Sequence, residues 1–180
     1  MSDSNSPINI EFRKQINENY SAATCIQMLT QTEENQQDIY FRMLRIMQNL
    51  KPADYSNKAL FHTPTQLIVG PKERLCKLIE DTLNHFKKND VFWDVQIGRK
   101  LEEFPAFAVF YPRRTQMNHL LKGHPVVITK IEEEKVTIYD PVNDEPVSIL
   151  KMRLSPLISS YFILKQTYFD GTPLEPKLVF

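Results

Sequence analysis

Four residues of types that serve nucleophilic catalysis follow one another along this chain. Ser21 stands where a run of helical spacing begins, His124 enters a predicted strand, and Asp140 leaves the next predicted strand. An aspartate on one imidazole nitrogen orients the ring and leaves the other nitrogen free to act as general base on a nucleophile. Gln15 adds a side-chain N–H that can donate to an oxyanion. Together the four residues point to acyl-transfer chemistry.

The predicted elements allow these residues to meet. A helix N-terminus offers free backbone N–H groups and a favourable dipole to an ionised nucleophile or an oxyanion, and position 21 has that setting. Antiparallel pairing brings the start of one hairpin strand beside the end of its partner. We therefore expect His124 and Asp140 to lie side by side.

Each residue also has a purely structural interpretation. Ser21 is a common N-cap type, His124 after a glycine fits a surface turn, and Asp140 before a proline fits an ordinary turn. His119 is a rival general base, although its segment gives no strand register toward Asp140. Cys25 is a rival nucleophile, but helical spacing puts it one turn into the apolar face, where a buried thiol is expected.

The segment around Ser21 resembles a known family. Residues 15–28 are similar to the nucleophile region of papain-like cysteine peptidases, above all the bacteriocin-processing peptidases that cut after double-glycine leaders. That family has a glutamine six residues before its catalytic cysteine, and Gln15 has this place relative to Ser21. Met28 matches the methionine at the end of a small-residue helix, and Cys25 matches a second, non-catalytic cysteine.

The second half of the chain carries the rest of the resemblance. Residues 123–131 are similar to the histidine strand of the family, and residues 136–141 resemble the Asp-Pro strand that pairs with it. Residues 104–110 resemble the strand before them.

The resemblance implies a mechanism and a division of roles. The residue at position 21 would attack a peptide carbonyl, His124 would exchange the proton, and Asp140 would orient the ring. Gln15 and the backbone N–H of position 21 would bind the oxyanion. No cofactor takes part in this chemistry.

Two positions depart from the family pattern. Ser21 stands where the nucleophilic cysteine is expected, and Ala22 stands where glycine is usual. A serine hydroxyl is far less acidic than a thiol with a pKa of about 8.5, so an imidazole that ionises a cysteine is poorly matched to a serine. Three explanations stay open: a natural pseudoenzyme that binds peptides, a cysteine-to-serine form made to be inactive, and a genuine serine nucleophile.

Helical spacing dominates the first half of the chain. Apolar residues recur at this spacing over residues 22–31 and 36–50, and a third such stripe follows Pro71. Residues 51–70 are interpreted as a long surface connection. The buried stripe of the third helix is expected to contain Leu75, Leu78, Ile79, Leu83 and Phe86.

Strand spacing dominates the second half. Strands are predicted at residues 104–111, 125–131, 135–140 and 161–164, with a hairpin turn at residues 132–134. Residues 150–157 are expected to form a short helical turn at most, broken by Pro156.

Helices followed by hairpin strands predict an α+β fold, papain-like, with a helical lobe packed on an antiparallel sheet lobe and the site in the cleft between them. A length of 180 residues fits one domain. We expect a flexible N-terminus over residues 1–9 and a single papain-like, peptidase-like domain over residues 10–180. Trp93 is expected to seal the core rather than to line a substrate groove.

Charge and composition make several classes of protein unfavourable. The 22 Lys and Arg residues balance the 22 Asp and Glu residues, so nothing in the net charge favours nucleic acid as a partner. No signal peptide or membrane-spanning stretch is recognised, so a cytoplasmic location is the default, with export by a non-classical route left open. Two cysteines without CxxC or HExxH spacing predict reduced thiols, no metal and no cofactor.

The leading function is therefore peptide amide hydrolysis of the cysteine-peptidase type, present here in an inactive form because of Ser21. The first alternative is a non-catalytic module that binds a peptide or a protein cargo. The second is a toxin or effector that uses the same triad for deamidation or acyl transfer. In each case the partner is a peptide or a protein, and the sequence does not give the oligomeric state.

Overall fold

Amphipathic helices form in the first half of the chain, where the apolar spacing predicts them. The computed structural model describes residues 10–49, 72–88, 90–99, 104–110, 123–168 and 173–174. The helices of the first half are α1 (Ser21–Thr30), α2 (Gln36–Asn49), α3 (Lys72–His85) and the short 3-10 helix η1 (Glu18–Tyr20). The helices predicted there are confirmed. The predicted flexible N-terminus (1–9) and surface connection (51–70) lie outside the described residues.

The second half forms an antiparallel sheet. Its strands are β1 (Val91–Ile97), β2 (Ala106–Phe110), β3 (His124–Glu132), β4 (Lys135–Tyr139), β5 (Val147–Leu150), β6 (Ile158–Tyr168) and β7 (Pro173–Leu174). The strand order is β1-β6-β2-β3-β4-β5, with β7 paired to β6. The hairpin predicted around residues 132–134 is confirmed as β3–β4, with Glu132 opposite Lys135.

Parts of the sheet were not predicted. β1 was missed, although it pairs with β6 along its whole length. β5 was missed because most of its residues are exposed and show no buried alternation. The predicted helical turn is present as α4 (Lys151–Leu154) and the 3-10 helix η5 (Ser155–Leu157), directly after β5. The last strand, predicted at residues 161–164, is the longer β6.

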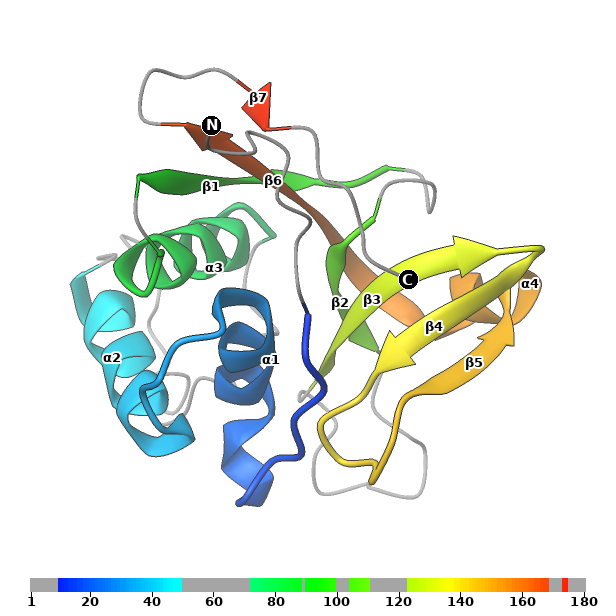
Figure 1. The fold of residues 1–180 in the computed structure, drawn as a ribbon, viewed down its shortest axis with the longest axis horizontal. Coiled ribbons are helices and arrows are strands. Elements are labelled where there is room, and N and C mark those ends of the chain that lie inside the picture. The colour runs from blue at the N-terminus through cyan, green and yellow to red at the C-terminus, as the bar shows by residue number, and fades with distance from the viewer. Residues whose placement is uncertain are drawn as a thin grey trace, which may run out of the picture.

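The two faces of the sheet bury different side chains, because successive residues of a strand point to opposite faces. On β2, Phe107 and Val109 pack in a cluster with the helices, whereas Ala106 and Ala108 belong to a second cluster that includes Leu154 of α4. In Figure 1, α1, α2 and α3 lie together on one side of the sheet, and α4 lies behind β4, where β5 ends.

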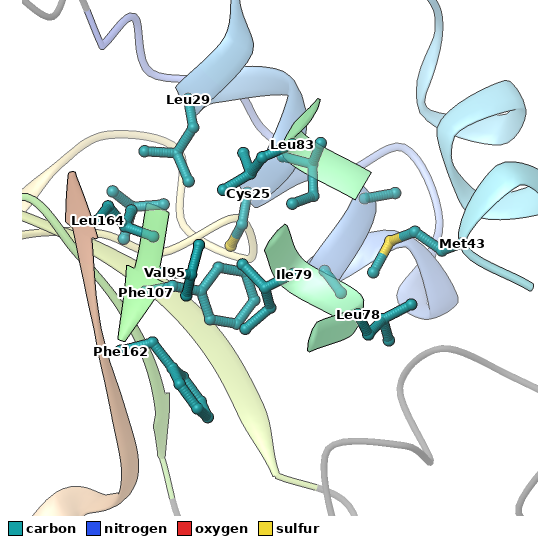
Figure 2. Close-up of a cluster of buried hydrophobic side chains, with 14 of the residues drawn as sticks. Cys25, Leu29, Met43, Leu78, Ile79, Leu83, Val95, Phe107, Phe162 and Leu164 are labelled. Atoms are coloured by element: carbon teal, nitrogen blue, oxygen red, sulfur yellow. The ribbon is translucent and has the colours of Figure 1, made fainter. Parts of the chain in front are cut away.

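The main core lies between the helices and the sheet. Figure 2 shows Phe107 and Val95 of the sheet beside Ile79 of α3 and Cys25 of α1. Trp93 of β1 is 4% exposed and belongs to the same cluster, which confirms its predicted place in the core. The predicted α+β class, with helices packed on an antiparallel sheet, is confirmed. Among the described residues, no helix combines the length and the apolar character needed to cross a membrane.

One face of α3 covers the outer edge of β1 with polar contacts. Asn84 accepts from the N–H of Trp93 at 2.7 Å and donates to its carbonyl at 3.0 Å. Glu80 accepts from the N–H of Val95 at 3.0 Å, and the thiol of Cys76 donates to the carbonyl of Val95 at 3.1 Å. These three helical residues are four apart, so one face of α3 satisfies backbone groups of an edge strand that would otherwise face water.

The turn between β3 and β4 holds two glutamates in the left-handed region, with φ of 48° at Glu133 and 69° at Glu134. Two-residue hairpin turns with φ above zero at both positions favour Asn-Gly, because a Cβ atom is strained there. We expect the double substitution Glu133→Asn and Glu134→Gly to raise the free energy of unfolding by about 1 kcal/mol, measured by urea denaturation. The pair Glu133→Gln and Glu134→Gln is the control, since it removes both charges and keeps both Cβ atoms. Equal stability of the two double variants would contradict the prediction.

Gly98 follows β1 and donates its N–H to the carbonyl of Tyr161 at 2.7 Å. A Cβ atom at this position would lie 2.3 Å from the Tyr161 ring, which is itself buried in the second core cluster. We expect Gly98→Ala to lower the free energy of unfolding by about 1–3 kcal/mol, because the ring must move within a packed core. Urea denaturation measures the change, with Gln96→Ala at an exposed position of β1 as control. A Gly98→Ala protein as stable as this control would refute the close contact.

Candidate active site

The strands β3 and β4 bring His124 and Asp140 together. His124 is the first residue of β3, Asp140 follows the last residue of β4, and 2.5 Å separates His124 Nε2 from Asp140 Oδ1. The side chains are 29% and 16% exposed, so the pair is partly shielded and still reached by solvent. Because Asp140 occupies Nε2, the other ring nitrogen, Nδ1, is the one left to act on a nucleophile.

The turn after β4 fixes the position of the Asp140 carboxylate. Its Oδ1 also accepts from the N–H of Val142 at 3.0 Å, and its backbone carbonyl accepts from the N–H of Asn143 at 3.0 Å. An aspartate that bonds the backbone two residues ahead forms an Asx turn. Asp140 is therefore both a turn residue and the partner of His124. The turn interpretation and the site interpretation of this residue are both correct.

Ser21 is the first residue of α1 and does not cap it. Tyr20 is the N-cap residue, without a side-chain capping bond, because η1 runs directly into α1. Asn17 instead caps η1 by accepting from the N–H of Asn19. The interpretation of Ser21 as an N-cap is therefore wrong, and its buried side chain, 3% exposed, has a different partner.

That partner is Gln15. The Ser21 hydroxyl donates to Gln15 Oε1 at 2.5 Å, and the backbone N–H of Gln15 donates to the carbonyl of Pro141 at 2.8 Å. Gln15 therefore links the start of α1 to the turn that carries Asp140. The sequence predicts an N–H of the Gln15 side chain at an oxyanion, whereas here its carbonyl oxygen faces Ser21. Within the described part of the chain, Gln15 Nε2 makes no hydrogen bond.

The structure does not join the two pairs directly. α1 contacts β3, but no hydrogen bond connects Ser21 with His124 in the segments that the structure describes. The site consists of a Ser21–Gln15 pair on the helical side and a His124–Asp140 pair on the sheet side, connected through the bond from Gln15 to Pro141. The rival base His119 lies outside the described residues.

Cys25 is a core residue. It is fully buried, and Figure 2 shows its sulfur among apolar side chains, next to Val95 and Phe107. Burial raises the pKa of its thiol well above the usual value, and the negative charge of Asp140 raises it further. The prediction of a buried, non-nucleophilic thiol at this position is confirmed.

Cys76 is only partly buried. Its side chain is only partly covered, because α3 places it beside the edge strand β1. Burial raises the pKa of the Cys76 thiol to about 11, with further contributions from Glu80, Asp94 and Glu73. Both cysteines are free thiols, as predicted.

Two contributors to the site are not predicted from the sequence. The backbone N–H of Val142 donates to the Asp140 carboxylate. The turn-forming residues after the strand could have predicted this contact, because aspartate in a turn commonly bonds the backbone two residues ahead. Gln36 holds the backbone on both sides of Gln15. No local signal identifies Gln36, because those partners lie 20 and 22 residues away along the chain.

Similarity to known proteins is found among solved structures only. No family model matches the chain, and no curated protein matches it. Among solved structures, it is similar to a double glycine motif protease from an AMS/PCAT transporter, in complex with the leader peptide. The sequences are 13% identical, the TM-score is 0.47, and the match covers 90% of this chain and 95% of that chain. A likeness at this level carries no argument about the site.

The two native cysteines are expected to react slowly with iodoacetamide in the folded protein. With a pKa of about 11, only about one Cys76 side chain in a thousand is a thiolate at pH 8, so its rate should rise steadily as the pH approaches 11. Cys25 should react only when the protein unfolds. Mass spectrometry of the labelled peptides follows both sites, with the denatured chain as reference. Labelling of Cys25 in the folded protein at the rate of the denatured chain would contradict this prediction.

Proposed function

We propose that this chain carries the site of a papain-like cysteine peptidase with serine at the nucleophile position, and that it handles an extended peptide. One observation carries the proposal: Asp140 holds His124 by Nε2 at 2.5 Å, in the arrangement that prepares an imidazole to serve as a general base. Ser21 at the start of α1, bonded to Gln15, supports it from the other side of the site. The resemblance of residues 15–28 and 123–141 to that family agrees with the proposal.

With a cysteine at position 21, these groups account for complete amide hydrolysis. The thiol proton moves to His124 Nδ1, the sulfur bonds to the peptide carbonyl carbon, and negative charge develops on the carbonyl oxygen. The backbone N–H of residue 21 and the turned carboxamide of Gln15 donate to that oxygen. The C–N bond then breaks, the amine takes the proton from His124, and water hydrolyses the thioester to free acid and thiol.

Serine changes the first of these steps. Its hydroxyl proton is donated to Gln15 Oε1, and the alcohol is far less acidic than a thiol in the same place. We expect the chain as it stands to cleave amides very slowly or not at all, while its peptide-binding surface is unaffected.

Peptide or cargo binding without cleavage is the second candidate function. The specific observation in its favour is the short Ser21–Gln15 hydrogen bond, in which the hydroxyl donates its proton to Gln15 and not to the imidazole. Deamidation or acyl transfer would use the same groups and is distinguished by its products, namely ammonia or a transferred acyl group instead of two peptide fragments.

One substitution tests the proposed site. We expect Ser21→Cys to give a thiolate whose pKa is well below 8.5, because His124 stabilises it. The rate at which this thiolate reacts with iodoacetamide should then stay high as the pH falls from 8 to 6. Over the same range the thiolate fraction of a free thiol falls about a hundredfold. His124→Ala in the same background should return the rate to the titration of a free thiol, and Asp140→Asn should lower it.

The controls separate activation from exposure. Glu18→Cys places a thiol on the exposed 3-10 helix just before α1, where it is more accessible to solvent than position 21 and has no imidazole partner, so it gives the titration of a free thiol. Slow labelling of Cys25 and Cys76 leaves a low background. If the Ser21→Cys thiol titrates like the Glu18→Cys thiol and ignores His124→Ala, the triad does not act as a unit and the peptidase proposal is wrong.

A further inference from the structure

Gln36 is a buried polar residue with three hydrogen bonds, at the start of α2. It is 5% exposed. Its Oε1 accepts from the N–H of Ile16 at 2.9 Å, and its Nε2 donates to the carbonyl of Lys14 at 2.9 Å and to Gln27 Oε1 at 3.1 Å. Since a backbone N–H only donates and a carbonyl only accepts, these partners fix the orientation of the carboxamide.

The backbone partners of Gln36 lie on either side of Gln15. The Gln36 side chain binds the carbonyl of Lys14 and the N–H of Ile16, which flank Gln15. A neighbouring β-strand would bind the same two backbone groups. From the other direction, the carbonyl of Pro141 accepts from the N–H of Gln15 itself. Residues 14–16 are thus held between α2 and the turn that carries Asp140. Because this backbone is fixed on both sides, the Gln15 side chain starts from a fixed position when it reaches Ser21.

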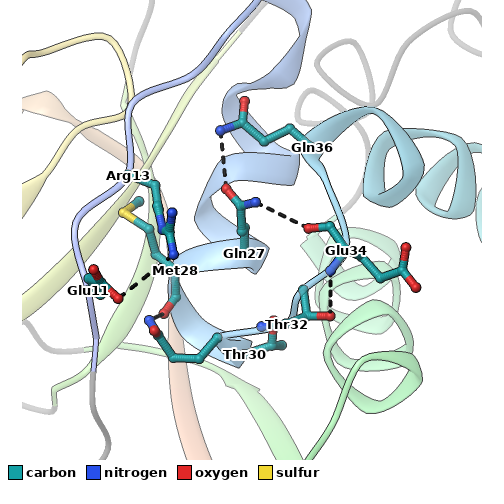
Figure 3. Close-up of polar contacts among 9 residues, drawn as sticks. Glu11, Arg13, Gln27, Met28, Thr30, Thr32, Glu34 and Gln36 are labelled. Atoms are coloured by element: carbon teal, nitrogen blue, oxygen red, sulfur yellow. Dashed lines mark hydrogen bonds and ion pairs between the residues drawn. The ribbon is translucent and has the colours of Figure 1, made fainter.

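A second row of hydrogen bonds anchors Gln36, as Figure 3 shows. Gln27 of α1 accepts from Gln36 and donates through its own Nε2 to the carbonyl of Glu34 at 3.2 Å. The N–H of Glu34 in turn donates to the hydroxyl of Thr32 at 3.2 Å. The carboxamides of Gln36 and Gln27 are each hydrogen-bonded through both the oxygen and the nitrogen, so the buried Gln36 side chain is held in one orientation.

We propose that Gln36 is a positioning residue for Gln15: by holding the backbone at Lys14 and Ile16, it directs the Gln15 carboxamide to position 21. This inference rests on the proposed function, in which Gln15 donates to the oxyanion. Gln36 does not touch the reacting atoms and acts through Gln15. A misplacement of about 1 Å at a reacting group can cost about a hundredfold in rate, so a well-held backbone at this point has a direct effect on catalysis.

The test uses the Ser21→Cys background and two probes. Iodoacetamide reports the thiolate and does not use the oxyanion site. A peptide aldehyde forms a hemithioacetal: the sulfur bonds to the aldehyde carbon, the C=O π bond opens, and the thiol proton passes to the former carbonyl oxygen, which occupies the oxyanion position. We expect Gln36→Met, which keeps the side-chain volume and removes all three hydrogen bonds, to weaken aldehyde binding about tenfold or more. The pH profile of the iodoacetamide rate should remain within about twofold.

A double-mutant cycle shows whether Gln36 acts through Gln15. Gln15→Ala should weaken aldehyde binding by itself, and Gln36→Met should add nothing in the Gln15→Ala background. The stability control is Thr82→Val, which removes a buried hydroxyl of α3 that donates to the carbonyl of Leu78, in a part of the fold with no bond to residues 14–16. Thr82→Val should change neither the affinity for the peptide aldehyde nor the iodoacetamide rate relative to the other.

Hydrogen exchange tests the contact itself without any chemistry at position 21. The amide of Ile16 should exchange faster in Gln36→Met than in the parent protein and should be unaffected by Thr82→Val. If Gln36→Met does not fold, Gln36→Glu replaces it, because a carboxylate still accepts from Ile16 and no longer donates to Lys14. Gln36→Glu should also weaken aldehyde binding selectively.

The outcomes separate the two proposals. If the iodoacetamide rate of Ser21→Cys ignores His124→Ala, the proposed function fails, and this inference fails with it. If that rate depends on His124 but a Gln36 variant binds the aldehyde as the parent does, only the positioning role is overturned. A loss that persists in full after Gln15→Ala would also overturn it, since Gln36 would then act by another route.

Discussion

The backbone hydrogen bond from Gln15 to Pro141 joins the two halves of the candidate site. Gln15 lies near the start of the described chain and Pro141 in the turn after β4, so no local preference can place them together. Two neighbouring contacts support the bond: Phe12 packs edge-to-face on Tyr139, with 5.6 Å between ring centroids, and Lys14 pairs with an aspartate of the same turn. Because the turn residue Asp140 also holds His124, the position of the N-terminal segment and the position of the imidazole depend on one short stretch of backbone.

The hydroxyl at position 21 fits this arrangement better than it fits a catalytic role. A buried hydroxyl needs a hydrogen-bond partner, and Gln15 supplies one at 2.5 Å. A thiol is a weak donor and would leave the Gln15 carboxamide freer to turn its nitrogen outward. Gln15 satisfies the buried serine here, and under the proposed function it would donate to an oxyanion once a cysteine stands at position 21. In a binding module the first role is sufficient. In a peptidase the second is required.

The sequence predicts the helices and strands whose apolar residues recur at a regular spacing. It does not predict the strands that form only because a neighbouring strand pairs with them. The stripes of α1, α2 and α3 and the hairpin of β3 and β4 follow from apolar spacing and local turn chemistry. The strands β1 and β5 carry weaker patterns, and each exists because a neighbouring strand completes its hydrogen bonds. In the site, the His124–Asp140 contact follows from hairpin geometry. The Ser21–Gln15 bond and the role of Gln36 depend on how α1 and α2 pack against the N-terminal segment, and that packing has no signature in local sequence.

The polar face of α3 determines how copies of this molecule can meet through their sheets. Cys76, Glu80 and Asn84 already bind the outward backbone groups at Trp93 and Val95, so an incoming strand finds no unpaired donor or acceptor at those positions. At the opposite end of the strand order, β5 has β4 as its one partner among the described strands. Head-to-tail growth of a sheet across many molecules needs two open edges, whereas one open edge allows only a symmetric pair that closes on itself. At Trp93 and Val95, α3 removes β1 as one of the edges that such growth would need.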